Sequence, residues 1–373
     1  MKICVVVGGG IIGTMHAYFA VSEGMKVVHV EQSVAPSAAS VRNFGLIWVS
    51  GRAPGAELSL AIRARELWEN IGAIIPETGF KGNGSLTVAL TEAEVQVLRQ
   101  AATLEDADLR GFHYLSGDEA RASEPTLSEN VLGALRCALD AVVEPDLVLG
   151  AIRTFLLKNP NYSWRHSTEI TNFGESESGV WATTANGERI HGDYLLLAPG
   201  ALHQGVCAEH LEDAPLRQVR LQMAETENLQ EVFHHSLADI DSLRYYPAFA
   251  RCDLTQLPPQ HSVADEFHMQ LLLAQRKNGG LTIGDTHEYD QPFASVLRDE
   301  PYSYLQSLLT KIFGRKLSLA RKWDGIYSQV TDSRIYFRKE ISARIHIVTG
   351  MGGRGNTISP AVAEETLTLW KAQ

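Results

Sequence analysis

Cysteine is scarce in this sequence, and its four occurrences lie far apart. Cys4, Cys137, Cys207 and Cys252 form no CxxC pair and no other spacing typical of metal ligands, so we predict no metal site and no disulfide framework. Isolated cysteines of this kind are typical of buried, reduced thiols. A chain of 373 residues buries enough apolar surface to fold without covalent cross-links.

A surplus of basic residues is also missing. The 33 Lys and Arg stand against 44 Asp and Glu, a formal net charge of −11, which argues against nucleic acid as a partner. No apolar run approaches the roughly 20 residues of a bilayer span. The short apolar run at residues 3–7 is interrupted by three glycines and lacks a cleavage site, unlike a signal peptide. We expect a cytoplasmic protein without a membrane span.

The N-terminus has the pattern of a nucleotide-binding βαβ unit. A β-branched run predicts a strand buried on both faces, and Gly8-x-Gly10-x-x-Gly13 follows it directly. The first glycine permits a tight turn, the second lets a pyrophosphate approach the backbone, and the third lets helix and strand pack closely. The next predicted strand ends at Glu31, near the position of a ribose-binding carboxylate. We predict a dinucleotide site; an ordinary glycine-rich turn with an exposed glutamate is the alternative.

A second glycine-rich turn, at residues 350–357, follows the last predicted strand and precedes the last predicted helix. The first unit alone does not distinguish NAD from FAD. A second helix N-terminus near the cofactor suits a flavin, because flavin reduction places negative charge near N1 and the C2 carbonyl. The pattern favours FAD, while a simple surface turn and an NAD-dependent dehydrogenase stay open as alternatives.

Between these turns, helical and strand-like segments alternate. The composition, 45% apolar and 21% charged, is typical of globular proteins, and about 150 residues per domain predicts two to three domains. Two of the predicted helices open with a capping box, Thr91-x-x-Glu94 and Ser116-x-x-Glu119. Strands are predicted over much of residues 163–197 and 216–290. Helices are predicted at residues 56–71, 91–104, 116–122, 302–313 and 360–371.

Taken together, these motifs resemble the D-amino-acid-oxidase-like family of FAD-dependent oxidoreductases, which includes glycine and sarcosine oxidases. The resemblance covers essentially the whole chain. Besides the two glycine-rich turns it includes Val143-Glu144-Pro145 before a helix and Ala198-Pro199-Gly200-Ala201 after a strand. Three shorter stretches are similar to a subfamily associated with phosphonate metabolism: residues 39–45, 221–223 and 284–289.

The resemblance implies an α/β (α+β) fold of glycine-oxidase-like architecture. A Rossmann-like FAD-binding domain would be assembled from residues 1–50, 146–215 and 323–373. A mixed-sheet substrate or cap domain with helical segments would comprise residues 51–145 and 216–322.

The same resemblance implies which residues hold FAD. Glu31 would bind the adenosine ribose, Ile170 would contact the adenine side through its backbone, and the last glycine-rich turn would face the isoalloxazine ring. The full set of expected cofactor-binding residues is Gly8, Gly10, Ile12, Gly13, Glu31, Gln32, Ser40, Arg42, Asn43, Ile170, Ala198, Gly200, Gly352, Gly353, Gly355, Asn356 and Thr357.

Departures from the family pattern are equally informative. Gly325 stands where covalent members carry a flavin-linking cysteine, so we expect noncovalent FAD. Tyr327 replaces an arginine that clamps the substrate carboxylate, and Thr357 replaces a lysine with the same role. A bidentate guanidinium is hard to replace in carboxylate recognition, which argues against a plain α-amino acid. Thr282 replaces a lysine that helps some members react with oxygen.

We expect Tyr245, Tyr246, Tyr327 and Arg354 to act on the substrate. Strand alternation across Tyr245 and Tyr246 would send their rings to opposite faces. An anionic phosphonate favours arginine partners. The pool of such arginines is Arg42, Arg220, Arg244, Arg334 and Arg354.

The chemistry implied is hydride transfer from the carbon next to a neutral amine to flavin N5, followed by hydrolysis of the imine. The predicted substrate is a small amine, with an aminoalkylphosphonate, N-methylated or not, as the specific case, and oxygen or an electron carrier as acceptor. One alternative is a glycine, sarcosine or D-amino-acid oxidase. Another is an FAD-binding subunit that needs a partner for activity.

Overall fold

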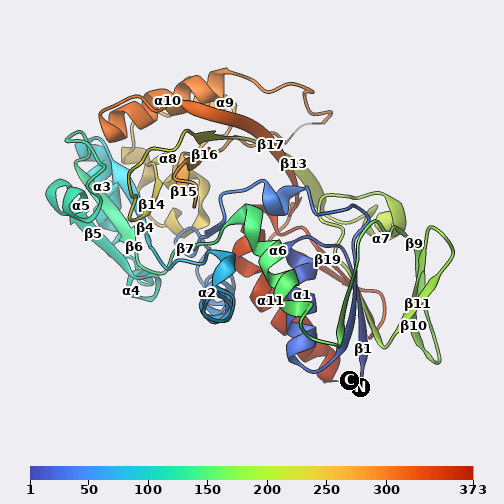
Figure 1. Cartoon of the computed structure of the whole chain (residues 1–373). Helices are drawn as coiled ribbons and strands as arrows, with labels where there is room; N and C mark the ends of the chain where they lie inside the picture. Colours follow the sequence, from blue (N-terminus) through green and yellow to red (C-terminus); the bar gives the residue numbers. More distant parts are fainter. Residues whose placement is uncertain (290, 373) are drawn as a thin grey trace.

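A six-stranded, mostly parallel sheet forms one half of the molecule in the computed structural model, which describes residues 1–289 and 291–372 (Figure 1). Five strands are parallel, and the edge strand β18 pairs antiparallel with β19. In spatial order the strands are β18 (Phe337–Glu340), β19 (Ile345–Thr349), β12 (Tyr194–Leu197), β1 (Ile3–Val7), β2 (Lys26–Val30) and β8 (Tyr162–Arg165).

Both faces of this sheet are covered, because alternate side chains of each strand point to opposite faces. On β1, Cys4 and Val6 pack with the helices, whereas Val5 packs against a three-stranded antiparallel sheet. The helices on the first face are α1 (Ile11–Ser22), α6 (Pro145–Leu156) and α11 (Gly355–Lys371), with α2 (Ala56–Ile74) packed against α11. The small sheet comprises β9 (Ile170–Ser176), β10 (Gly179–Thr184) and β11 (Arg189–Gly192).

An eight-stranded mixed sheet forms the other half. Its strand pairs are antiparallel except for β14 with β4. The order is β17 (Leu319–Val330), β13 (Leu216–Thr226), β16 (Leu281–Gly284), β15 (Leu272–Gln275), β14 (Ser236–Ala238), β4 (Ser85–Ala89), β6 (Gly133–Cys137) and β5 (Phe112–Ser116). The strands β3 (Leu46–Ile47) and β7 (Ala141–Val142) pair with each other and form a separate two-stranded antiparallel sheet.

The two faces of the mixed sheet carry separate cores. On β15, Leu273 packs toward α10 (Glu300–Phe313), whereas Leu272 and Ala274 belong to the core that also contains Trp48. The remaining helices are α3 (Glu92–Ala101), α4 (Ala107–Arg110), α5 (Gly117–Ser123), α7 (Ala208–Leu211), α8 (Asp241–Tyr245) and α9 (Ser262–Glu266).

Most predicted helices are confirmed, and both predicted capping boxes form. The last helix begins at Gly355, earlier than the predicted start at Pro360. A proline inside a helix leaves the carbonyl four residues earlier without its amide donor. Here that carbonyl, on Asn356, accepts a 2.7 Å hydrogen bond from Nε1 of buried Trp68. The side chain from α2 therefore lets α11 run through its proline.

The prediction of mainly strands over residues 216–290 is wrong within residues 241–266, where the short helices α8 and α9 stand. In α8, Nε of Arg244 donates to Oδ1 of Asp241 at 2.9 Å, three residues earlier. This spacing joins neighbours on a helix but not on a strand. Tyr245 and Tyr246 therefore do not alternate across a sheet.

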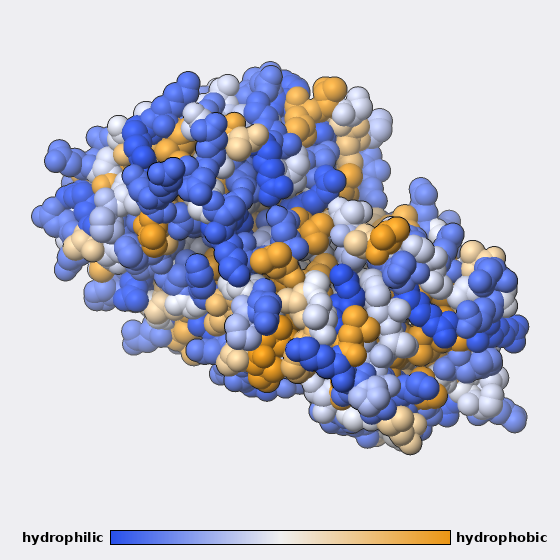
Figure 2. Space-filling model, in the orientation of Figure 1, coloured by the Kyte–Doolittle hydropathy of each residue, from blue (hydrophilic) through white to orange (hydrophobic). Residues whose placement is uncertain are grey.

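The expected division into two domains stays a prediction. Its proposed boundary between residues 322 and 323 falls inside β17, which pairs with β13 along nearly its whole length. None of the helices built from residues 1–289 and 291–372 combines the length and apolar character that a bilayer span requires. On the face seen in Figure 2, hydrophobic residues are scattered in small groups among hydrophilic ones.

We predict that Trp68→Phe lowers the free energy of unfolding by about 1–3 kcal/mol, because it leaves the Asn356 carbonyl without a donor. Pro360→Ala restores a backbone amide at position 360, which can then donate to the Asn356 carbonyl within the helix. The double variant is therefore expected to lose less stability than the sum of the single variants, as measured by denaturant titration. Strictly additive effects would contradict this account of the helix.

Candidate functional site

The first glycine-rich turn brings three chain segments together at the carboxyl end of β1. Gly8 has a φ of +114°, and a Cβ atom there would lie 2.4 Å from the Ala198 carbonyl oxygen. A Cβ atom at Gly13 would lie 1.9 Å from the Gly8 carbonyl oxygen. Both positions therefore require glycine, and the helix α1 begins close against its strand. The N-cap residue Gly10 makes no side-chain cap.

Glu31 stands at the end of β2, beside this turn. Its Oε2 accepts a hydrogen bond from the Gly9 amide at 2.7 Å, and its Oε1 accepts one from the Ser33 amide at 2.9 Å. Of the other residues expected here, Ile12 is half-buried, Gln32 is exposed, and Ile170 is buried at the start of β9. The Gly200 carbonyl oxygen accepts a 2.6 Å hydrogen bond from Thr349 Oγ1.

The loop after β2 runs along the start of α1. Ser40 Oγ accepts a 3.0 Å hydrogen bond from the Ile11 amide. Asn43 Oδ1 accepts from Asn356 Nδ2 at 2.7 Å, which ties this loop to α11. Arg42 is partly exposed, and its Nη1 donates to the Asp324 carbonyl at 2.9 Å.

The second glycine-rich turn delivers another helix N-terminus to the same place. A Cβ atom at Gly355 would lie 3.8 Å from Cγ2 of Ile11, so α1 and α11 begin side by side. Thr357 Oγ1 accepts a 2.9 Å hydrogen bond from the Trp48 amide. Two helix N-termini thus direct their partial positive charge into one region.

A cavity of about 720 Å³ opens beside these N-termini. Alternate residues of the paired strands β13 and β17 line it, including Leu221 and Met223 on one and Gly325 on the other. The expected site residues that line it are Ser40, Arg42, Asn43, Tyr245, Tyr246, Tyr327, Gly352, Gly353, Arg354, Gly355 and Asn356. The fold therefore gathers the second glycine turn and all four expected substrate residues around one space.

The two tyrosines expected on opposite faces both line this cavity. Their rings meet edge to face, with centroids 5.0 Å apart. The difference arises because the pair lies at a helix end and not within a strand: Tyr245 is the last residue of α8 and Tyr246 is its C-cap, so the alternation of side chains along a strand does not apply to them. Burial raises the pKa of both phenols well above the ordinary value, so they stay neutral hydrogen-bonding groups.

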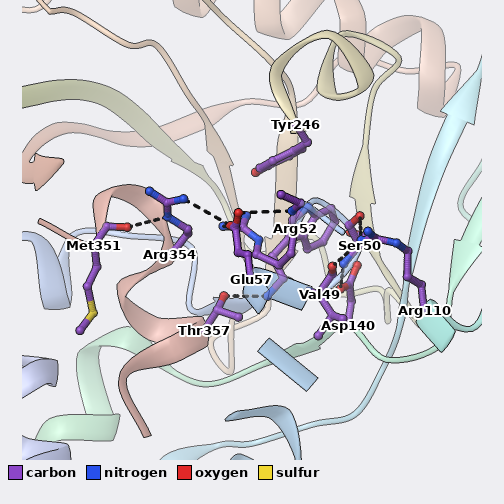
Figure 3. A network of polar contacts seen from close by, with 12 residues as sticks. Val49, Ser50, Arg52, Glu57, Arg110, Asp140, Tyr246, Met351, Arg354 and Thr357 are labelled. Atoms are coloured by element: carbon purple, nitrogen blue, oxygen red, sulfur yellow. Dashed lines mark hydrogen bonds and ion pairs between the residues drawn. The ribbon is translucent and has the colours of Figure 1, made fainter. Parts of the chain in front are cut away.

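Sequence reasoning missed Arg52 and Glu57, which join Arg354 in a network at the cavity (Figure 3). Glu57 Oε1 lies 3.4 Å from Nη1 of Arg52 and 3.3 Å from Nη1 of Arg354. Arg52 is only 5% exposed, and within the described chain its Nε has no hydrogen-bond partner. The available signal was an arginine in a Gly-Arg-Ala-Pro turn just before a predicted helix.

Sequence reasoning also missed Asp285 and Gln270, which line the cavity from the mixed-sheet side. Burial raises the pKa of Asp285 to about 8, and burial lowers the pKa of neighbouring His287 to about 4. Asp285 lies within one of the stretches resembling the phosphonate-associated subfamily, which was the signal available in the sequence.

The other arginines in the expected pool are already paired. Buried Arg220 lies 2.9 Å from Asp324 Oδ2 and 3.3 Å from Glu288 Oε2. Arg334 pairs with Asp332 at 2.7 Å, and Arg244 pairs with Asp241. Of the pool, Arg354 alone belongs to the network around Glu57.

Comparisons with known proteins identify the family and the fold of this chain. Over residues 4–369 the sequence matches the profile of a family described as FAD dependent oxidoreductase. An opine oxidase subunit of Rhizobium meliloti is 22% identical over 342 residues, covering 88% of this chain and 82% of that protein. Glycine oxidase of Bacillus licheniformis is 22% identical over 374 residues, covering 96% of this chain and 90% of that protein.

Solved structures show the same fold. Glycine oxidase from Bacillus cereus ATCC 14579 superposes with a TM-score of 0.80 at 19% identity, covering 100% of this chain and 95% of that chain. L-proline dehydrogenase from P. horikoshii superposes with a TM-score of 0.79 at 20% identity, covering 99% of this chain and 92% of that chain. The expected glycine-oxidase-like architecture is confirmed.

We predict that Gly10→Val protein is purified without bound flavin, because the added side chain fills the space beside Ser40 Oγ, where a Cβ atom alone would lie 3.1 Å away. Flavin content is read from the visible spectrum. The matched control is Gly150→Val in α6, where a Cβ atom meets only the tip of Arg153 at 4.0 Å. Full flavin occupancy in the Gly10 variant would refute the assigned turn.

Acid sensitivity is a second prediction. His29 Nε2 lies 2.9 Å from the Gly8 carbonyl oxygen, and its Nδ1 lies 3.0 Å from the Tyr162 hydroxyl. Burial lowers the pKa of His29 to about 4, against about 6.5 in the unfolded chain. Between these pH values the unfolded state binds a proton that the folded state does not, so stability falls as pH falls, by about 1 kcal/mol per pH unit.

Denaturant titrations from pH 7.5 to 4.5 measure this slope. His29→Gln keeps a hydrogen-bonding side chain but removes the titration, so its slope is expected to be shallower than that of the wild-type protein. His16 and His287, whose burial also lowers their pKa values, to about 3 and about 4, retain their share. An unchanged slope would assign the effect to those histidines instead.

Proposed function

The chain belongs to the family of FAD-dependent oxidoreductases, and on that premise we propose that it oxidises the C–N bond of a small amine that carries an anionic group. The proposed substrate is an aminoalkylphosphonate, N-methylated or not. The observation that carries this proposal is Arg52, a buried arginine at the cavity that the second glycine turn also lines, whose Nε has no hydrogen-bond partner among the described residues.

The residues present fit FAD. The glycine cradle at Gly8 and Gly13 has no room for side chains, and the neighbouring N-termini of α1 and α11 suit the pyrophosphate and the flavin. In this proposal the loop holding Ser40, Arg42 and Asn43 lies along the cofactor, and Glu31 binds the ribose. The remaining expected cofactor residues keep the roles that the family resemblance implies.

Noncovalent attachment of FAD is part of the proposal. All four cysteines are buried, and none of them is among the residues that line the cavity. Gly325 lines the cavity at the position where covalent relatives would carry cysteine. A Cβ atom added there would lie 3.2 Å from the Arg42 carbonyl oxygen. Denaturation should therefore release the flavin into solution.

Bound FAD supplies a hydride acceptor for the carbon next to the amine. The chain's task is to place that carbon, to favour the neutral amine and to exclude water. The rings of Tyr245, Tyr246 and Tyr327 provide apolar walls on the side of the mixed sheet. Hydrolysis of the resulting imine gives a carbonyl product and an amine, and the electrons pass to oxygen or to a carrier.

The anion anchor is assigned to Arg52 and Arg354. Two guanidinium groups face one carboxylate, Glu57, so the network has one positive charge in excess. The Arg52 guanidinium also lies over the Tyr246 ring at 5.3 Å, which fixes its plane. An anion with several oxygen atoms, such as a phosphonate, accepts hydrogen bonds well from the paired N–H groups of a guanidinium, and burial strengthens this interaction.

We predict that N-methyl-2-aminoethylphosphonate bleaches the flavin band under anaerobic conditions, and that N-methylpropylamine, which lacks the anion, does so far less efficiently. In Arg52→Gln, KM for the phosphonate should rise about 30- to 150-fold, with little change for N-methylpropylamine, which has no anionic group for the arginine to bind. The control is Arg63→Gln, which removes an exposed arginine paired at the surface with Glu364. Equal reduction of the flavin by both amines would refute the assignment of Arg52 and Arg354 as the anion-binding residues.

A second candidate is an FAD-binding subunit that needs a partner for activity, which is favoured by the similarity to a protein named as one subunit of an opine oxidase. Anaerobic reduction of the isolated chain by any amine would refute it. Glycine and sarcosine belong in the same assay, because bleaching by either one in preference to the phosphonate would favour an ordinary amino-acid oxidase.

A further inference from the structure

The proposed reaction cavity contains a buried carboxyl group that has no cationic partner in the part of the chain that the structure describes. Asp285 follows β16 and is 5% exposed. Its amide donates to the Gln270 carbonyl at 2.9 Å, so the backbone of the mixed sheet holds it in place. Its Oδ1 is buried and has no hydrogen-bond partner within the described chain. Such an atom is costly to bury unless a ligand completes it.

The groups around Asp285 do not neutralise it. His287 Nε2 lies 3.9 Å from its Oδ2, but burial keeps this histidine neutral by lowering its pKa to about 4. The phenols that face it from α8 and β17, Tyr245 and Tyr327, are neutral, and no lysine or arginine among the described residues pairs with it. Tyr246 and Tyr289 are the other titratable groups that act on it, and both are phenols.

Glu57, a second buried acidic residue that lines the cavity, is different. Glu57 has two arginine partners, whereas Asp285 has none among the residues described. Tyr246 lies between the two groups: its ring faces the Arg52 guanidinium, and its hydroxyl accepts from Gln270 Nε2 at 3.3 Å. One cavity thus offers a cationic end at Arg52 and an unpaired carboxyl on the Gln270 side. A small zwitterion has the complementary pair of charges.

We propose that Asp285 binds the ammonium group of the substrate and accepts its proton at Oδ1. This inference rests on the proposed function, in which the substrate is an amine with an anionic group at its other end. The N–H bond breaks, an O–H bond forms on Asp285, and the electron pair stays on nitrogen. The amine is then neutral, as hydride loss from the adjacent carbon requires, and the proton on Asp285 later returns to water.

A pH dependence follows. Asp285 binds the ammonium ion as a carboxylate, so the fraction of competent free enzyme rises with pH through the carboxyl pKa of about 8. Above the pKa of the substrate amine, about 10 for an alkylamine, the fraction of ammonium falls. Binding therefore has a maximum between these two values.

The experiment compares two ligands on dithionite-reduced holoenzyme, which binds amines without oxidising them. Dissociation constants of N-methyl-2-aminoethylphosphonate and propylphosphonate are measured by calorimetry from pH 6 to 10, for wild-type protein, Asp285→Asn and the exposed control Glu129→Gln. Near pH 9 the wild type and the control should prefer the aminophosphonate about 10- to 100-fold. Asp285→Asn should lose this preference and still bind propylphosphonate.

Retention of the preference in Asp285→Asn overturns the proposal, as does a wild-type protein that does not bind the aminophosphonate. If the variant fails to fold or to hold flavin, the wild type decides: its preference must grow as pH rises through about 8, and a preference independent of pH from 6 to 9 overturns the proposal. The two proposals can fail separately. If the aminophosphonate is preferred as predicted but no amine bleaches the oxidised flavin, the result supports the binding role of Asp285 and refutes amine oxidation.

Discussion

The close approach of two helix N-termini is the constraint on which the rest of this structure depends. The helices α1 and α11 begin side by side, although their sequences lie at opposite ends of the chain. Glycine at position 13 lets α1 begin close to the first turn, because a Cβ atom there would collide with the Gly8 carbonyl oxygen. The combined partial charges of the two helix N-termini create a region suited to a phosphate and to a reduced flavin, and the cavity of about 720 Å³ opens beside it.

A second constraint holds the loop that carries Arg52. Asp140 accepts hydrogen bonds from the Val49 and Ser50 amides at 2.6 and 2.9 Å, and from the Ser85 hydroxyl at 2.6 Å. Arg110 donates to the carbonyls of the same two loop residues (Figure 3). Because Ser85 begins a strand of the mixed sheet, this buried network ties the loop to that sheet. The position of the proposed anion anchor therefore depends on both halves of the molecule.

The charges that line the cavity come from both of these arrangements and are unevenly distributed. One side presents the N-termini of α1 and α11 and the Arg52–Glu57–Arg354 network. The mixed-sheet side presents neutral phenols and the carboxyl of Asp285, which has no cationic partner within residues 1–289 and 291–372. Charges that lie apart in a water-poor space interact more strongly with a ligand than exposed charges do. Our proposals for substrate and proton acceptor both follow from this uneven distribution.

Local sequence determined the nucleotide turn, the capped helices and the buried parallel strands, because spacing, glycine and capping residues act over only a few positions. The family resemblance extended this to the architecture. It did not reveal that α11 runs through Pro360, since the compensating donor is Trp68 on another helix. Nor did it reveal Arg52 or Asp285: the first is an ordinary loop arginine, the second one acid in a short motif. Their importance depends on burial and missing partners, which arise only when distant segments pack together.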